Sequence, residues 1–214
     1  KGMPSLAEEL QIARDLYILE YTGGRLHIPT ISTKASVQLI KEAKAKGLQV
    51  TCSVALPHLY FTSEVLNSFD SKYKIQPPLR IEEDSKALKK AVESGIIDMV
   101  TCDHEPINEE LKVKEFENAS YGSIGLESAF PALNTLFGVE KASELLSKSK
   151  AHLGMNTSKI EVDHRADLSL FEPNSEDVFS KKHIFSKSKN SMFLGESLKG
   201  KVLGSIYNNS LYEN

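Results

Sequence analysis

The chain has 214 residues, of which 40% are hydrophobic, and this is enough to bury one substantial core. Its formal net charge of -3 leaves no excess of lysine and arginine to neutralise a phosphate backbone, so we expect no nucleic-acid binding. The longest apolar stretches, such as residues 96–100, are far shorter than the roughly 20 residues that cross a bilayer, so we expect no membrane span. The two cysteines, Cys52 and Cys102, each follow a β-branched pair, and we predict reduced thiols in a cytoplasmic protein.

Apolar periodicity predicts that helices and strands alternate along the first half of the chain. Ser5 and Glu8 have the spacing of a capping box at the start of a first helix, which ends at residues 23–24. The residues that mark one face of this helix are Leu6, Leu10, Ala13 and Leu16. Further helices are predicted at residues 32–47, 82–93, 125–137 and 140–147, and strands at residues 25–31, 48–55 and 96–102. The apolar strands lack polar alternation, which indicates parallel strands covered by helices and an α/β fold.

The remaining segments are predicted to be loops and short strands. Residues 105–120 are polar and acidic, and we expect a mobile loop there. Short strands are predicted at residues 166–171, 183–186 and 201–207, with a hairpin turn at Asn208 and Asn209. We predict that residues 160–171 pair with residues 201–212 in a small β-domain. The expected domains are therefore residues 1–155 and residues 156–214.

The segment with the strongest chemical signal is residues 97–106, an apolar strand that ends abruptly in Asp103 and His104. An aspartate at a strand end is well placed to bind a metal ion and to take a proton from a metal-bound water. A carboxylate that caps the following turn is an equally good interpretation of this feature alone.

Several motifs together resemble dihydroorotases of the multifunctional-complex type, which are members of the amidohydrolase superfamily. The matching segments are residues 26–34, 73–80, 100–106, 122–127, 166–168 and 198–202, in the order and approximate spacing of that family. The resemblance covers nearly the whole chain and implies the C-terminal half of a (β/α)8 barrel with a composite β-domain. The chain opens at Lys1-Gly2-Met3-Pro4 without a signal pattern, so we expect it to start part-way through a longer protein.

The resemblance also implies a chemistry. Dihydroorotases reversibly close N-carbamoyl-aspartate to dihydroorotate, with two zinc ions in the barrel mouth and an His-x-His pair in the half that precedes this chain. By that resemblance Asp103 is the metal-binding and proton-shuttling acid, Gln76 stands where an asparagine binds substrate, and Tyr121 and Gly122 match the backbone contact to the ring. A homodimer is a further expectation, as is a place in pyrimidine biosynthesis.

The chain departs from this pattern at two positions. Thr30 stands where the family has a metal-binding histidine, and a neutral hydroxyl is a poor zinc ligand. His27 lies three residues away, so strand alternation points it to the opposite face. Ile107 follows the segment that matches the family's Asp-His-Ala-Pro stretch and replaces a histidine that contacts the charged edge of the substrate. His58, all that remains of a His-His pair, is expected to pack or turn its loop rather than to bind metal.

These departures leave two hypotheses open. One is an active hydrolase of cyclic amides with a partly degenerate or single-metal site. The other is a non-catalytic pseudo-dihydroorotase that acts as an assembly partner of aspartate transcarbamoylase. From the visible residues we predict that this chain forms no fully coordinated zinc site at Asp103.

Overall fold

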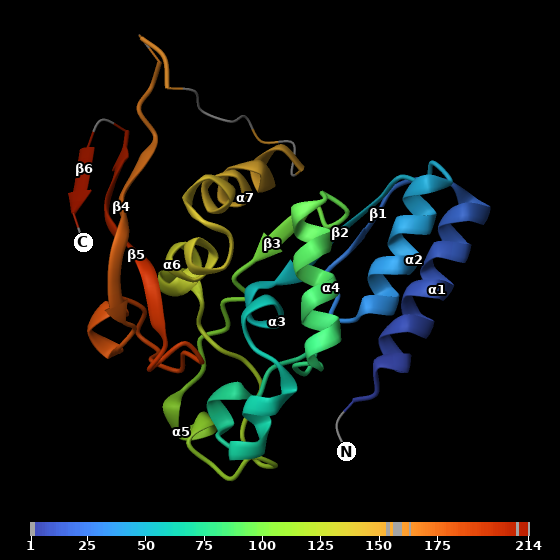
Figure 1. Cartoon of the computed structure of the whole chain (residues 1–214), viewed down its shortest axis with the longest axis horizontal. Coiled ribbons are helices and arrows are strands. Elements are labelled where there is room, and N and C mark those ends of the chain that lie inside the picture. Colours follow the sequence, from blue (N-terminus) through green and yellow to red (C-terminus); the bar gives the residue numbers. More distant parts are fainter. Residues whose placement is uncertain (1–2, 153–154, 156–159, 163, 209, 214) are drawn as a thin grey trace. The chain divides into compact units, whose positions relative to one another are not determined.

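A computed structural model of the chain describes residues 3–152, 155, 160–162, 164–208 and 210–213, without the side chains of residues 149–152 (Figure 1). The chain divides into two compact units. The first comprises Lys1–Gly125 with Ser186–Met192, and the second comprises Leu126–Phe185 with Phe193–Asn214. The domain boundary at residues 155 and 156 stays a prediction. In the part of the chain that the structure describes, no helix is long and apolar enough to cross a membrane.

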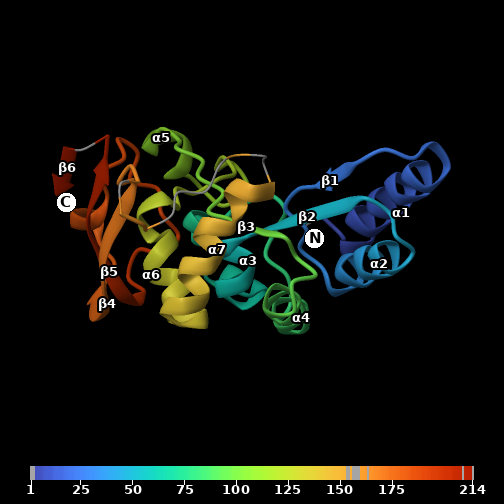
Figure 2. The ribbon, with the colours of Figure 1, turned by 90° about the horizontal axis from the view of Figure 1, so that it is seen from above.

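The first unit is built on a parallel sheet with the strand order β1-β2-β3. Its helices and strands are α1 (Ser5–Thr22), β1 (Leu26–Ile28), α2 (Lys34–Ala45), β2 (Val50–Ala55), α3 (Leu56–Tyr60), α4 (Glu82–Glu93), β3 (Met99–Thr101) and α5 (Glu109–Lys112), with short 3-10 turns at Ser63–Ser68 and Ser71–Tyr73. The central strand β2 is buried on both faces, and Cys52 and Val54 are fully inaccessible. Helices α1 and α2 lie side by side in both views (Figures 1 and 2). The predicted parallel α/β organisation is confirmed, and both cysteines are free thiols.

The start of α1 differs from the prediction. Pro4 occupies the N-cap position and no side chain caps the helix, so the capping box is wrong. The Glu8 carboxylate instead accepts hydrogen bonds from the Ser32 backbone N–H (2.8 Å) and the Ser36 hydroxyl (2.7 Å). Glu8 therefore satisfies free N–H and hydroxyl groups at the start of α2 rather than those of its own helix.

The buried face of α1 is also displaced from the prediction. The residues that this helix buries are Ile12, Leu16 and Leu19. Leu6 and Leu10 are 58% and 61% exposed, so only Leu16 of the predicted face belongs to the core. The hydrogen bonds from Ser32 and Ser36 to Glu8 fix which side of α1 faces α2. The spacing of apolar residues alone does not indicate that side.

The other elements of the first unit follow the predictions closely. Helix α4 has the predicted bounds, and the Thr33 hydroxyl accepts a hydrogen bond from the Ser36 N–H (3.0 Å) to cap α2. Strand β1 ends at Ile28, directly before Pro29, because proline has no N–H for a strand ladder. Residues 105–120 are not a featureless loop, since they contain α5 and the buried Lys112.

The second unit packs two helices and an antiparallel sheet of order β4-β5-β6. Its elements are α6 (Leu126–Phe137), α7 (Val139–His152), β4 (Leu168–Val178), β5 (Ser197–Tyr207) and β6 (Ser210–Glu213). Helix α6 lies between the sheet and α7 (Figure 2), and the rings of Phe130 and Phe171 are 4.5 Å apart. The predicted pairing of the two β-rich segments is confirmed for residues 168–172 with residues 201–206.

Two details of the second unit differ from the predictions. Residues 183–186 form no strand. A 3-10 turn covers Lys181–His183 instead, and the Ser180 backbone N–H donates to His183 Nδ1 (3.0 Å) to hold it. The predicted hairpin is present as the β5–β6 pair, with Tyr207 opposite Ser210 and a positive φ of 49° at Asn208, whereas Asn209 lies outside the described residues.

Candidate functional site

The carboxyl ends of the three parallel strands lie at one edge of the sheet, because Ile28 is level with Cys52 and Ala55 is level with Thr101. Thr30 and Asp103 follow the first and third of these ends. Both have positive φ, 51° and 50°, which non-glycine residues rarely adopt. The backbone therefore bends sharply at both positions, close to the strand ends where sites commonly form in parallel α/β folds.

Asp103 has an environment suited to proton transfer. Its side chain is partly buried, and burial raises the pKa of its carboxyl above the ordinary value, with the nearby Glu105 carboxylate adding to the effect. It lies two residues after the end of β3, close to the strand end as expected, while the direction of its carboxylate stays a prediction. The neighbouring His104 accepts a hydrogen bond at Nδ1 from the Gly125 N–H (3.3 Å), so this ring helps to shape the edge.

Glu105 and Ile107 lie over Gly122. The Glu105 N–H donates to the Ser123 carbonyl (2.9 Å), which aligns the two segments. Gly122 has a φ of 112°, and a Cβ atom there would lie 2.5 Å from Glu105 Oε2 and 2.8 Å from Ile107 Cδ1. The positive φ favours glycine here, and any side chain would also displace the tips of Glu105 and Ile107. Ile107, which occupies the expected position of a substrate-binding histidine, is thus brought against the expected ring contact.

Gln76 and Tyr121 lie on segments that are joined next to Gly122. The Gly122 N–H donates to the Lys74 carbonyl (2.9 Å), two residues before Gln76. The Gln76 residue is exposed, whereas Ile75 beside it is buried and anchors the segment. The Lys74 ammonium lies 4.9 Å from the centre of the Tyr121 ring. The structure therefore brings together the segments that carry Gln76, Tyr121 and Gly122.

Asn190 is a residue of this edge that the sequence did not reveal. The Asn190 side-chain NH2 donates to the Glu105 carbonyl (3.3 Å) and the Gly122 carbonyl (3.5 Å), and the Asn190 backbone carbonyl accepts from the Ile124 N–H (3.1 Å). The Ser188 hydroxyl, nearby in the chain, donates to the Ile107 carbonyl (2.7 Å). These bonds join residues more than 60 positions apart, and no local periodicity signals them.

His58 is a buried residue that is hydrogen-bonded to the segment that carries Gln76. Its Nε2 lies 3.0 Å from the Pro77 carbonyl oxygen, which can only accept, so Nε2 carries the proton. Its Nδ1 is buried without a hydrogen-bond partner among the described residues. Burial lowers the pKa of His58 to about 4, so the ring is neutral near pH 7. His58 packs and turns its loop, in agreement with the expectation.

The described residues do not by themselves fit a zinc site. Among them, no three histidine, cysteine, aspartate or glutamate side chains converge. Structural and catalytic zinc sites need at least three protein ligands, and the Thr30 hydroxyl is a weak donor. Zinc chemistry at Asp103 would therefore require ligands from beyond these residues.

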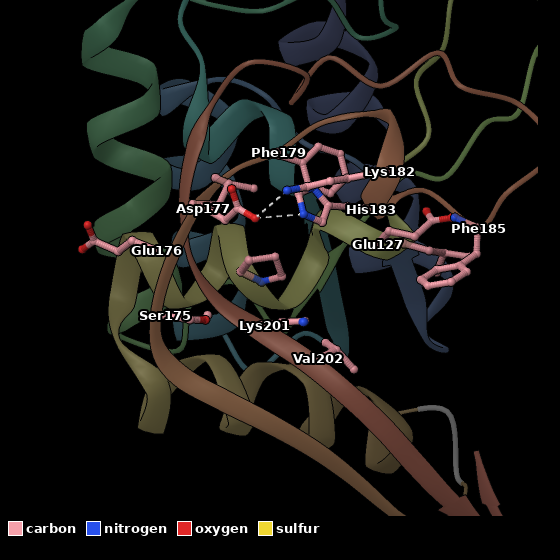
Figure 3. Close-up of a pocket in the computed structure, with 14 residues that line it drawn as sticks. Glu127, Ser175, Glu176, Asp177, Phe179, Lys182, His183, Phe185, Lys201 and Val202 are labelled. Atoms are coloured by element: carbon pink, nitrogen blue, oxygen red, sulfur yellow. Dashed lines mark hydrogen bonds and ion pairs between the residues drawn. The ribbon is translucent and has the colours of Figure 1, made fainter. Parts of the chain in front are cut away.

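A concave feature lies wholly within the second unit. It is a cavity of about 740 Å³ between α6 and strands β4 and β5 (Figure 3). Asp177 is one of its lining residues and pairs with both Lys182 and His183 at 3.1 Å. Its other charged lining residues are Glu127, Glu176 and Lys201. Charges of both signs are thus interleaved, and the set selects no particular class of ligand.

Comparison with known proteins identifies the family of the chain. No protein-family model matches it. It is 36% identical over 215 residues to a dihydroorotase of Leifsonia xyli subsp. xyli, covering 96% of this chain and 49% of that protein. It is 38% identical over 209 residues to a dihydroorotase of Thermoanaerobacter sp., covering 94% of this chain and 48% of that protein. The chain belongs to the dihydroorotase family. This dihydroorotase-family chain spans about half the length of the curated relatives that it matches.

Solved structures agree on the fold of this dihydroorotase-family chain. An L-hydantoinase (dihydropyrimidinase) from Arthrobacter aurescens matches with a TM-score of 0.88 and 25% identity, covering 98% of this chain and 49% of that one. An inactive dihydroorotase-like domain of a Chaetomium thermophilum CAD-like multifunctional protein matches with a TM-score of 0.69 and 21% identity, covering 94% and 54%. The expected half of an amidohydrolase barrel is confirmed.

Proposed function

We propose that the complete gene product containing this chain is a dihydroorotase-like hydrolase of cyclic amides that turns over dihydroorotate poorly. One observation carries the proposal. Gln76, Tyr121 and Gly122 lie on adjoining segments near the partly buried Asp103, while Ile107 covers Gly122 where the resemblance leads us to expect a histidine. The segments that would hold a ring are thus assembled, but the contact to its charged edge is replaced.

The roles that we propose follow from the chemistry of each group. The raised pKa of Asp103 suits a carboxyl that takes up and returns a proton at the ring nitrogen during opening and closure. The exposed Gln76 amide can both donate to and accept from a cyclic amide. The backbone at Tyr121 and Gly122 would fix the ring edge. Zinc would come only with further ligands, so we assign no step to it.

Glu105 and Ile107 together disfavour an anionic substrate. Dihydroorotate carries a carboxylate, and an approaching carboxylate meets the Glu105 carboxylate next to Gly122 instead of a histidine. Like charges at close range repel, and an isoleucine side chain forms no hydrogen bond to compensate. A ring without the carboxylate, such as 5,6-dihydrouracil, avoids this repulsion.

The experiment is a turnover assay of the complete gene product with dihydroorotate and dihydrouracil, run beside metal analysis. The wild type should hydrolyse dihydroorotate very poorly, and Thr30→His combined with Ile107→His should raise that turnover. Asp103→Asn in the same double variant is the matched control and should abolish the gain. Two tightly bound zinc ions with brisk wild-type turnover of dihydroorotate would contradict the proposal.

A second candidate function follows from the same substitutions. The loss of a metal-ligand position at Thr30 and of a substrate contact at Ile107 also suits a non-catalytic protein that assembles with aspartate transcarbamoylase, or with a second copy of itself. Sedimentation of the complete gene product alone and with aspartate transcarbamoylase separates the candidates. A stable complex without turnover of either ring by any variant would favour assembly over catalysis.

A further inference from the structure

Lys112 is a buried lysine at the end of α5. The residue is only 4% exposed, although lysine is among the residue types that are least often buried. Its ammonium donates to the Lys74 carbonyl (2.9 Å) and the Ser120 carbonyl (3.1 Å). Burying a charged group costs free energy unless its hydrogen bonds are satisfied, so these two bonds are the reason that the site tolerates it.

The two carbonyls belong to the two segments that carry the proposed ring contacts. Lys74 precedes Gln76 by two residues, and Ser120 directly precedes Tyr121. The Lys74 carbonyl accepts from both the Lys112 ammonium and the Gly122 N–H, at 2.9 Å each. One cation therefore bridges the segments at the point where they meet.

The backbone around Lys112 is bound to the same surroundings. The Ser71 hydroxyl donates to the Lys112 carbonyl (2.7 Å), and the Ser120 N–H donates to the Leu111 carbonyl (2.9 Å). This backbone docking fixes where α5 lies. The Lys112 side chain therefore starts from a fixed backbone position, within reach of both carbonyls.

The charges that face Lys112 come from three neighbouring segments. Glu105 and Asp70 favour its charged form, while Lys74 opposes it. Burial outweighs these effects and lowers the pKa of Lys112 to about 8. The ammonium therefore remains charged near pH 7, and charge-assisted bonds to carbonyls are stronger than neutral ones.

We infer that Lys112 is a positioning residue that holds the Gln76 segment against the Tyr121–Gly122 segment, so that the two form one surface for the ring. The importance of that surface for a substrate rests on the proposed function. The bridge itself is a property of this chain and can be measured without substrate.

The test is amide hydrogen exchange, followed by NMR in the complete gene product, for wild type, Lys112→Met and Lys112→Arg. Lys112→Met keeps the apolar stem but removes the donors. Exchange of the Gly122 amide should become at least about tenfold faster, because the Lys74 and Ser120 carbonyls each lose a charge-assisted hydrogen bond. Lys112→Arg restores donors and should recover part of the protection. The Ile31 amide, bonded to the Ser53 carbonyl at 2.9 Å, should be unchanged.

Lys44→Met is the control for a general loss of stability, because Lys44 pairs with Asp98 at 2.7 Å and also donates to the Ile96 carbonyl at 2.8 Å, away from these segments. It should not speed Gly122 exchange selectively, and any faster exchange in this variant should be shared by Gly122 and Ile31. Unchanged Gly122 exchange in folded Lys112→Met, or an equal increase at Gly122 and Ile31, would overturn the inference. Turnover assays decide the proposed function separately, since selective exchange at Gly122 supports the bridge whether or not any ring is hydrolysed.

Discussion

The charged side chains at the two ends of the parallel sheet in the first unit have different kinds of partner. At the amino end, Asp98 precedes β3 and pairs with Lys44 at 2.7 Å, and its carboxylate also accepts from the Cys52 N–H at 2.8 Å. At the carboxyl end, Asp103 is flanked by a second carboxylate, and Lys112 is bonded to carbonyls. At the amino end, opposite charges neutralise each other in an ion pair that joins two elements of the fold. At the carboxyl end, two carboxylates lie close together and the buried ammonium is bonded to neutral carbonyls. Burial raises the pKa of Asp103 and lowers the pKa of Lys112, and shifted pKa values of this kind are common where proteins bind and react.

Removing Asp98 should produce the largest loss of stability. Asp98→Ala leaves the Lys44 ammonium without its carboxylate and the Cys52 N–H without its acceptor, so the free energy of unfolding should fall by about 3–5 kcal/mol. Urea unfolding measures it. The matched control is Glu20→Ala, which breaks the exposed pair with Lys46 and should cost about 0.5 kcal/mol or less. Similar losses in both variants would end the contrast between a structural pair and a surface pair.

His58 should make the stability of the folded chain sensitive to acid. Its pKa is about 4 in the folded chain and about 6.5 when unfolded, so the unfolded state binds the proton first as pH falls. Stability should therefore drop between pH 6.5 and pH 4, by up to about 3 kcal/mol. His58→Gln keeps a donor for the Pro77 carbonyl but does not titrate, and it should lose less stability over that window. Equal pH profiles for the two proteins would contradict the buried, neutral histidine.

Lys112 should act in the opposite range of pH. Its pKa is about 8 when folded and about 10.5 when unfolded, so the unfolded state binds more protons between these values. Relative to Lys112→Met, the wild type should gain stability as pH rises from 8 to 10.5, by about 1–2 kcal/mol. Thermal unfolding at matched ionic strength measures the difference. A wild type that loses stability over this window would mean that a carboxylate pairs with the ammonium.

Much of the first unit could be predicted because its signals are local. The apolar run of β2 and the bounds of α4 depend on residues that are neighbours in sequence, and both were predicted. The capping role predicted for Glu8 is wrong because its actual partners, Ser32 and Ser36, are more than 20 residues away in the sequence. The spacing of Ser5 and Glu8 is the same whether Glu8 caps its own helix or contacts a distant segment, so the spacing does not distinguish the two.

The candidate site shows the same limit. Asp103 stands out in sequence because a strand end is a local feature, and Gly122 is identified by the resemblance to dihydroorotases. Lys112 and Asn190 do not stand out, since their importance comes from carbonyls in distant segments. Glu105 attracts no notice in an acidic stretch, and its contact with Gly122 appears only when the two segments are aligned.

In our proposal, Gln76 and Gly122 form a surface for a cyclic amide at the carboxyl end of the sheet. The most direct measurement is an NMR titration of the complete gene product with dihydrouracil and with dihydroorotate. We predict that dihydrouracil shifts the Gly122 amide and the Gln76 side-chain amide, that dihydroorotate does so more weakly, and that the Cys52 amide does not move. Unchanged Gly122 and Gln76 resonances with both rings at millimolar concentration would contradict this proposal.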